Sequence, residues 1–160
     1  MSEDGARRAE VVCGIDGSSG SRRALQEAIR TAARRGDRVR AVAVYEPAEM
    51  WAGWGYGPGG AVPPPDPDAL QREELGAARQ MVDEVLAEMA GDGTLPEVSV
   101  EAVPGRAVEV LVATARGADE LVVGHRGRGA FGSVVLGSVG LGCVLHATCP
   151  VTVVPEPVAA

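Results

Sequence analysis

The chain has 160 residues, a hydrophobic fraction of 46% and a formal net charge of −7, which suit one domain with a real core and disfavour general binding to nucleic acids. It contains no lysine, which excludes a P-loop ending in Gly-Lys and Schiff-base chemistry. No apolar run approaches ~18 residues and the first residues have no apolar signal core, so we expect a cytoplasmic protein without a membrane span.

The N-terminal part of the chain predicts a strand, a turn, a helix and a second strand. Residues 9–15 are short and apolar, residues 21–35 have a helical apolar stripe, and residues 38–45 become uniformly apolar. Asp16 follows the first strand, at the position where open α/β sheets place ligand contacts. A turn-forming or helix-capping role for Asp16 is an equally good interpretation.

The segment 46–67 interrupts this regular pattern. It is rich in glycine and proline and contains both tryptophans, Trp51 and Trp54. Such a composition is typical of a long loop, either a mobile flap that contacts a partner or plain disorder. We expect flexible tails at residues 1–8 and 156–160, on either side of a single domain at residues 9–155.

The second half of the chain predicts three more helices and three more strands. We expect helices at 68–90, 106–116 and 138–147, and strands at 97–103, 119–124 and 151–154. The strict alternation of the strand at 97–103 predicts an edge of the sheet. Strands that alternate with helices favour an α/β fold with a parallel sheet and helices on both faces.

A glycine-rich segment joins the fourth predicted strand to the last helix. Its spacing is Gly124-x2-Gly127-x9-Gly137-Ser138. Glycines expose backbone N–H groups, and a helix N-terminus attracts anions, so the segment suits a phosphate. Ser138 could also cap the helix and donate its hydroxyl group. The alternative is a connection that binds no ligand.

A basic residue and an acidic residue could complete such a site. The guanidinium group of Arg126 could reach a phosphate, or it could lie in solvent. If the first and fourth strands are neighbours where the strand order reverses, Asp16 and the glycine-rich segment open into one crevice.

Taken together, residues 9–154 resemble the universal stress protein family, and the glycine pattern resembles that of its ATP-binding subgroup. The resemblance rests on residues 11–18, on residues 42–44, on residues 118–124 and on residues 149–154. It implies a Rossmann-like five-stranded parallel sheet of order 3-2-1-4-5, with the nucleotide between strands one and four.

The resemblance also implies roles for single residues. Asp16 would contact the ribose, backbone groups of Val44 would meet the adenine, and the phosphates would lie against the glycine-rich segment. The expected set of nucleotide contacts is Ile15, Asp16, Val44, Val123, Gly124, Arg126, Gly127, Gly137, Ser138 and Val139. Gly140 departs from the family pattern, which often has a small hydroxyl residue there, so one phosphate contact is in doubt.

The resemblance implies a function and a partner as well. We expect an ATP-binding protein, which could take up Mg²⁺ together with the nucleotide, that acts in a stress response through a nucleotide-linked change of shape or partner. It would form a homodimer through the edge strand 151–154, which is apolar. The alternatives are a homodimeric interaction module that needs no nucleotide and, ranked last, a slow ATPase or an adenylylating enzyme. A carboxylate introduced at Gly124 or Gly137 should abolish nucleotide binding, because it would meet the phosphate.

Overall fold

The computed structural model describes residues 9–50, 65–126 and 136–156. Strands and helices alternate along the chain, as the sequence predicted. The elements are β1 (Glu10–Ile15), α1 (Ser19–Arg35), β2 (Arg38–Tyr45), the 3-10 turn η1 (Ala48–Met50), α2 (Pro67–Met89), β3 (Val98–Pro104), α3 (Ala107–Thr114), β4 (Glu120–Gly124), α4 (Ser138–His146) and β5 (Val151–Val154).

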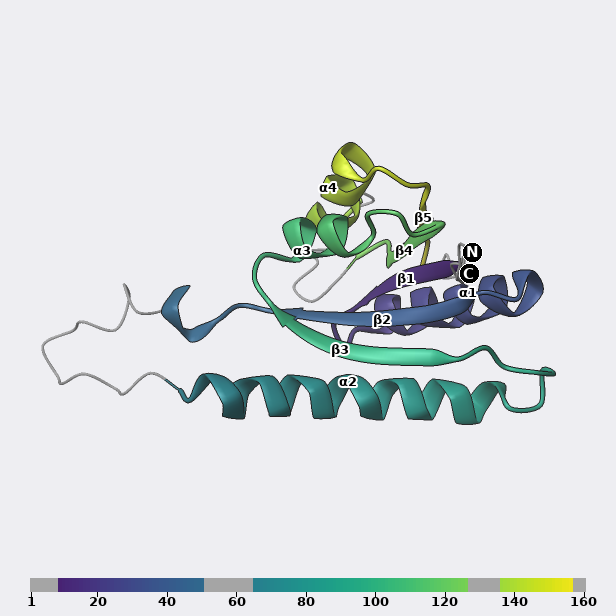
Figure 1. Ribbon diagram of the computed structural model, residues 1–160, viewed down its shortest axis with the longest axis horizontal. Helices are drawn as coiled ribbons and strands as arrows, with labels where there is room; N and C mark the ends of the chain where they lie inside the picture. Colours follow the sequence, from purple (N-terminus) through teal and green to yellow (C-terminus); the bar gives the residue numbers. More distant parts are fainter. Residues whose placement is uncertain (1–8, 51–64, 127–135, 157–160) are drawn as a thin grey trace, which may run out of the picture.

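The five strands form one parallel sheet in the order β3-β2-β1-β4-β5 (Figure 1), which confirms the predicted topology. β1 lies between β2 and β4, with Cys13 opposite both Ala41 and Val122. The chain moves outward from β1 to β3 and then returns to β4 on the other side of β1. The strand order therefore reverses between β1 and β4, where open α/β sheets place their ligands.

The helices cover both faces of the sheet, as predicted. α1 and α2 pack on the face that carries Val11 and Cys13, whereas α3 and α4 pack on the face that carries Val12. Figure 1 shows α2 below the sheet and α3 and α4 above it. The connections from β1 to β2 and from β2 to β3 run across the sheet in one direction, whereas those from β3 to β4 and from β4 to β5 run in the other. Because each crossover is right-handed, α1 and α2 lie on one face and α3 and α4 on the other.

The amino end of α1 begins two residues earlier than predicted. Ser18 is the N-cap, and its hydroxyl oxygen accepts a hydrogen bond from the N–H of Ser21 at 3.1 Å. The helix can therefore start at Ser19, immediately after the turn that follows β1. It ends, as the sequence indicated, at Gly36, whose φ of 78° places it in the left-handed region.

Charged pairs connect neighbouring elements near both edges of the sheet. β3 is an edge strand, as its alternating pattern predicted, and its Glu101 accepts a hydrogen bond from Arg40 of β2 at 2.7 Å. At the other edge, Glu120 of β4 is buried and pairs with Arg35 at 2.7 Å. Its second oxygen accepts from the hydroxyl group of Thr152, so one carboxylate connects α1, β4 and β5.

Some predictions concern residues outside the described part of the chain. The tail at 1–8, most of the tail at 156–160 and Gly127 belong to this group, as does the stretch 51–64 of the loop expected at 46–67. The described start of that loop holds the single turn η1. The flexibility of these segments stays a prediction.

Candidate functional site

A cavity of about 940 Å³ lies at the carboxyl end of the sheet, where the strand order reverses. Its volume is in the range of small-molecule and cofactor sites. The loops after β1 and β4 both line it, so the predicted crevice exists. The predicted contact residues that line it are Ile15, Asp16, Val44, Val123, Gly124, Arg126, Gly137, Ser138 and Val139, while Gly127 lies outside the described residues.

The first turn of α1 packs tightly against the end of β4. A Cβ atom built on Gly124 would lie 2.7 Å from the backbone carbon of Gly20, and one built on Gly20 would lie 2.5 Å from the carbonyl oxygen of Arg126. Neither position has room for a side chain. The prediction that Gly124 is a glycine in order to admit a ligand is therefore incomplete, because the backbone of α1 already occupies the space beside it.

Asp16 performs the turn-forming role that the sequence left open. One oxygen of its carboxylate accepts from the N–H of Ser18 at 2.9 Å and from the Ser18 hydroxyl group. The N–H of Asp16 donates to the hydroxyl oxygen of Ser21 at 3.2 Å. Since Asp16 also lines the cavity, these bonds fix its carboxylate at the cavity wall.

The amino end of α4 opens into the cavity without a side-chain cap. Gly137 is the N-cap and no side chain hydrogen-bonds there, so the prediction that Ser138 caps the helix is wrong. Ser138 is the first helical residue, and its backbone comes after the capping position. Ser138, Val139 and Gly140 line the cavity, and the N–H groups of a first helical turn have no partner inside their own helix.

His125 holds the two ends of the glycine-rich segment together. Its carbonyl oxygen accepts from the N–H of Gly137 at 2.9 Å, and its own N–H donates to the carbonyl oxygen of Val154 at 2.9 Å. His125 itself lines the cavity and is half-buried. These bonds place Arg126 and the start of α4 at the same end of the cavity.

Arg126 carries a buried polar atom that has no partner among the described residues. Its Nε lies out of contact with solvent, and no hydrogen-bond acceptor reaches it within the described part of the protein. A buried N–H group of this kind costs about 1–3 kcal/mol until an acceptor satisfies it. The sequence suggested Arg126 as an anion contact, and its place on the cavity wall agrees with that hypothesis.

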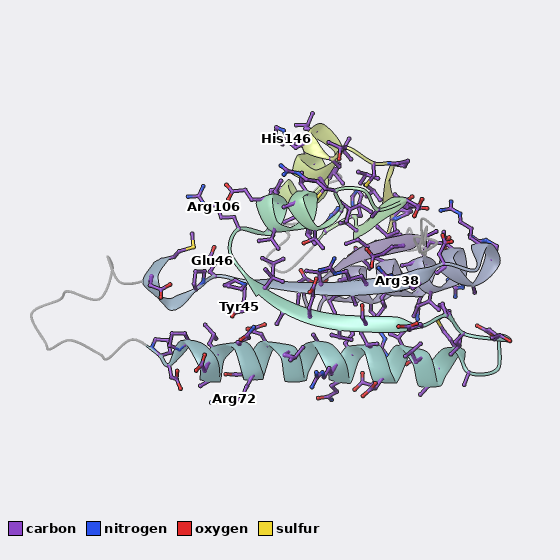
Figure 2. All side chains as sticks on the ribbon, in the orientation of Figure 1. Arg38, Tyr45, Glu46, Arg72, Arg106 and His146 are labelled. Atoms are coloured by element: carbon purple, nitrogen blue, oxygen red, sulfur yellow. The ribbon has the colours of Figure 1, made fainter. Side chains whose placement is uncertain are left out.

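The opposite wall of the cavity was not anticipated from the sequence. It is formed by the first half of α2, together with Tyr45 and Glu46 at the end of β2. Figure 2 shows Tyr45 and Glu46 at the carboxyl end of β2, far from Arg38 at the start of that strand. The contributing residues of α2 are Leu70, Glu74, Ala77, Ala78 and Met81. Their spacing places them on one face of the helix, which is a signal in the sequence, but spacing alone does not show that this face borders a cavity.

The cysteines form no disulfide and take part in no metal-ligating cluster among the described residues. All three cysteines are free, and burial raises the pKa of the Cys13 thiol far above its usual range and that of Cys143 to about 11. Within residues 9–50, 65–126 and 136–156, no group of three or more metal-ligating side chains occurs. No helix in these ranges combines the length and apolar character needed to cross a membrane.

The fold and the cavity together define a parallel α/β domain with a ligand-sized hollow at its switch point. The sequence profile of the Universal stress protein family matches residues 8–155, which is nearly the whole chain. The protein therefore belongs to the universal stress protein family.

Two curated relatives support the assignment. A universal stress protein of Thermus aquaticus is 32% identical over 146 residues, covering 90% of this chain and 96% of the relative. A universal stress protein of Mycobacterium tuberculosis (strain ATCC 25618 / H37Rv) is 32% identical over 151 residues, covering 91% of this chain but 48% of the relative. The chain thus spans about half the length of its mycobacterial relative.

Solved structures of low sequence identity share the fold. A universal stress protein in complex with cAMP has a TM-score of 0.61 at 24% identity, covering 92% of this chain and 97% of that one. An AMP-bound family member from Arabidopsis thaliana has a TM-score of 0.55 at 18% identity, covering 93% and 92%. A dAMP complex from Archaeoglobus fulgidus has a TM-score of 0.56 at 20% identity, covering 91% and 96%.

Proposed function

We propose that this protein binds an adenine nucleotide, ATP in the first place, and that the bound nucleotide regulates its shape or its choice of partner in a stress response. The observation that carries the proposal concerns one end of the cavity. There the uncapped start of α4 and Arg126, whose buried Nε has no hydrogen-bond partner among the described residues, line the same cavity. Both groups would attract a phosphate, because a helix N-terminus and a guanidinium group each favour an anion.

The rest of the cavity suits a nucleoside. Ile15, Val44 and Val123 line its wall, and Asp16 supplies a fixed carboxylate that can accept hydrogen bonds from ribose hydroxyl groups. Three structural neighbours were solved with cAMP, dAMP or AMP, which supports an adenine nucleotide for this chain. The described residues offer no cluster of carboxylates for a dedicated Mg²⁺ site, so Mg²⁺ would enter with the phosphates.

Calorimetric titration tests this proposal directly. We expect ATP to bind the purified protein with a stoichiometry of one per chain, and we expect mass spectrometry of the denatured protein to detect a released adenine nucleotide. The protein must first be freed of any nucleotide that copurifies. If ATP, ADP, AMP and cAMP all give no heat and no thermal stabilisation with the nucleotide-free protein, the proposal is wrong.

A second candidate function is a homodimeric interaction module that needs no nucleotide, and one surface favours it. β5 is an edge strand whose backbone groups on the outer side have no neighbouring strand in the described sheet. Beside it, α4 exposes Leu141, Val144 and Leu145, with Leu145 67% accessible to solvent. Apolar side chains next to an unpaired strand are typical of a protein–protein interface.

We expect the Leu145→Glu variant to shift the protein from dimer to monomer, because the new carboxylate would be buried without a partner in the interface. Light scattering coupled to gel filtration measures the mass. The matched control is Ala87→Glu, which adds the same charge to the exposed face of α2 and should leave the dimer intact. A wild-type protein that is monomeric at micromolar concentration would rule out this interface.

A further inference from the structure

The two walls of the cavity carry opposite charges. Arg126 lies at the end formed by β4 and α4, whereas Asp16, Glu46 and Glu74 lie on the side formed by β1, β2 and α2. An elongated ligand with a phosphate at the Arg126 end would therefore present its other end to carboxylates. Carboxylates accept hydrogen bonds and donate none, so this wall favours a ligand group that carries N–H or O–H donors.

Glu74 differs from several other glutamates that are buried or half-buried among the described residues. The half-buried Glu10 and Glu101 and the buried Glu120 each pair with an arginine at 2.7 to 3.0 Å. Among the described residues, no hydrogen bond or ion pair engages the carboxylate of Glu74, although its side chain is half-buried against the cavity. A partly buried carboxylate without a partner is stabilised by any donor that enters beside it.

The surroundings of Glu74 suit a flat aromatic ring. Within α2, Leu70, Ala77, Ala78 and Met81 lie on the same helical face and line the cavity with Glu74. Two of them are alanines, which leave space, and Glu74 is the only charged member of the stripe. A base that lies against this face would have its polar edge within reach of a single acceptor.

The end of β2 connects this wall to the expected base position. Tyr45 follows Val44 directly and also lines the cavity. Burial raises the pKa of the Tyr45 hydroxyl group, and the negative charges of Glu74 and Asp68 raise it further. The negative charge of Glu74 therefore acts on the residue next to Val44, and Glu74 belongs to the α2 wall of the cavity, whereas Arg126 follows β4.

We propose that Glu74 determines the base specificity of the site by accepting a hydrogen bond from the exocyclic amino group of the purine. This inference rests on the proposed nucleotide-binding function and adds to it the residue that distinguishes adenine from purines without that amino group. Glu74 acts here as a binding residue and contributes no chemistry.

The test compares ATP with purine riboside triphosphate, which lacks the 6-amino group, in calorimetric titrations of full-length protein. For the wild type we expect ATP to bind at least about tenfold more tightly, as is typical of a hydrogen bond to a charged group. In Glu74→Leu this preference should disappear, so that both triphosphates bind with about the same affinity, while the affinity for purine riboside triphosphate stays as in the wild type. Glu74→Gln should retain part of the preference, because its amide oxygen still accepts.

The matched control is Glu73→Leu, which removes the same charge from the adjacent exposed residue of α2 and should keep the full preference. An unchanged preference in Glu74→Leu would overturn this inference while leaving nucleotide binding intact. Tighter binding of GTP than of ATP would also overturn it, because a carboxylate can instead pair with the N1–H and 2-amino groups of guanine. If neither triphosphate binds any variant or the wild type, the proposed function itself fails.

Discussion

The Arg126→Gln variant is expected to bind ATP about 10- to 100-fold more weakly than the wild type. Arg126 lines the cavity and its Nε has no partner among the described residues, so a phosphate in the cavity would gain a charge-assisted hydrogen bond from the guanidinium group. A hydrogen bond to a charged group contributes about 1.5–3 kcal/mol, which corresponds to this loss of affinity. Calorimetric titration measures the affinity. Because glutamine leaves no buried charge, thermal unfolding should show a folded protein.

The control for this prediction is Arg106→Gln. Arg106 is an exposed arginine at the start of α3 that forms a 3.7 Å pair with Glu109 and does not line the cavity. Figure 2 shows its side chain pointing away from the sheet. The control loses the same overall charge, so any general electrostatic effect would appear in both variants. Equal ATP affinities for Arg126→Gln, Arg106→Gln and the wild type would remove Arg126 from the binding site.

The Gly124→Ala variant should be less stable than the wild type by about 2 kcal/mol in the free energy of unfolding. The added methyl group would lie within 2.8 Å of the backbone carbon and oxygen of Gly20, and a backbone cannot move aside like a flexible side chain. Overpacking of this kind costs about 1–3 kcal/mol. Urea denaturation followed by circular dichroism measures the difference.

Gly76→Ala provides the opposite control. Gly76 lies inside α2, and a Cβ atom there meets nothing within 4 Å. Alanine in a helix is more favourable than glycine by about 0.5–1 kcal/mol, so this variant should be more stable than the wild type. If Gly124→Ala unfolds at the wild-type urea concentration, α1 and β4 do not pack as described. Because of the same contact, a carboxylate at Gly124 would disturb the packing of α1 against β4. A loss of nucleotide binding in Gly124→Asp would therefore not report on the phosphate site.

Sequence patterns were sufficient for the elements and for their order. The bounds of β2 and β5 agree with the prediction, because apolar runs between glycine, proline and charged residues depend only on neighbours along the chain. The same holds for the turn after β1, where Asp16 was recognised as a turn former or ligand contact. The capping of α4 is different. Whether Gly137 or Ser138 caps a helix depends on one backbone angle, which composition does not encode.

The sequence by itself determined that strands and helices alternate, that β3 lies at an edge and that Asp16 and the glycine-rich segment follow strands. Only the tertiary structure decided that α2 forms the second wall of the cavity, that Glu74 lies there without a partner among the described residues, and that Gly20 and Gly124 touch. The physical reason is distance along the chain. Local patterns record which residues are buried, but the crossovers of the chain determine which buried surfaces meet.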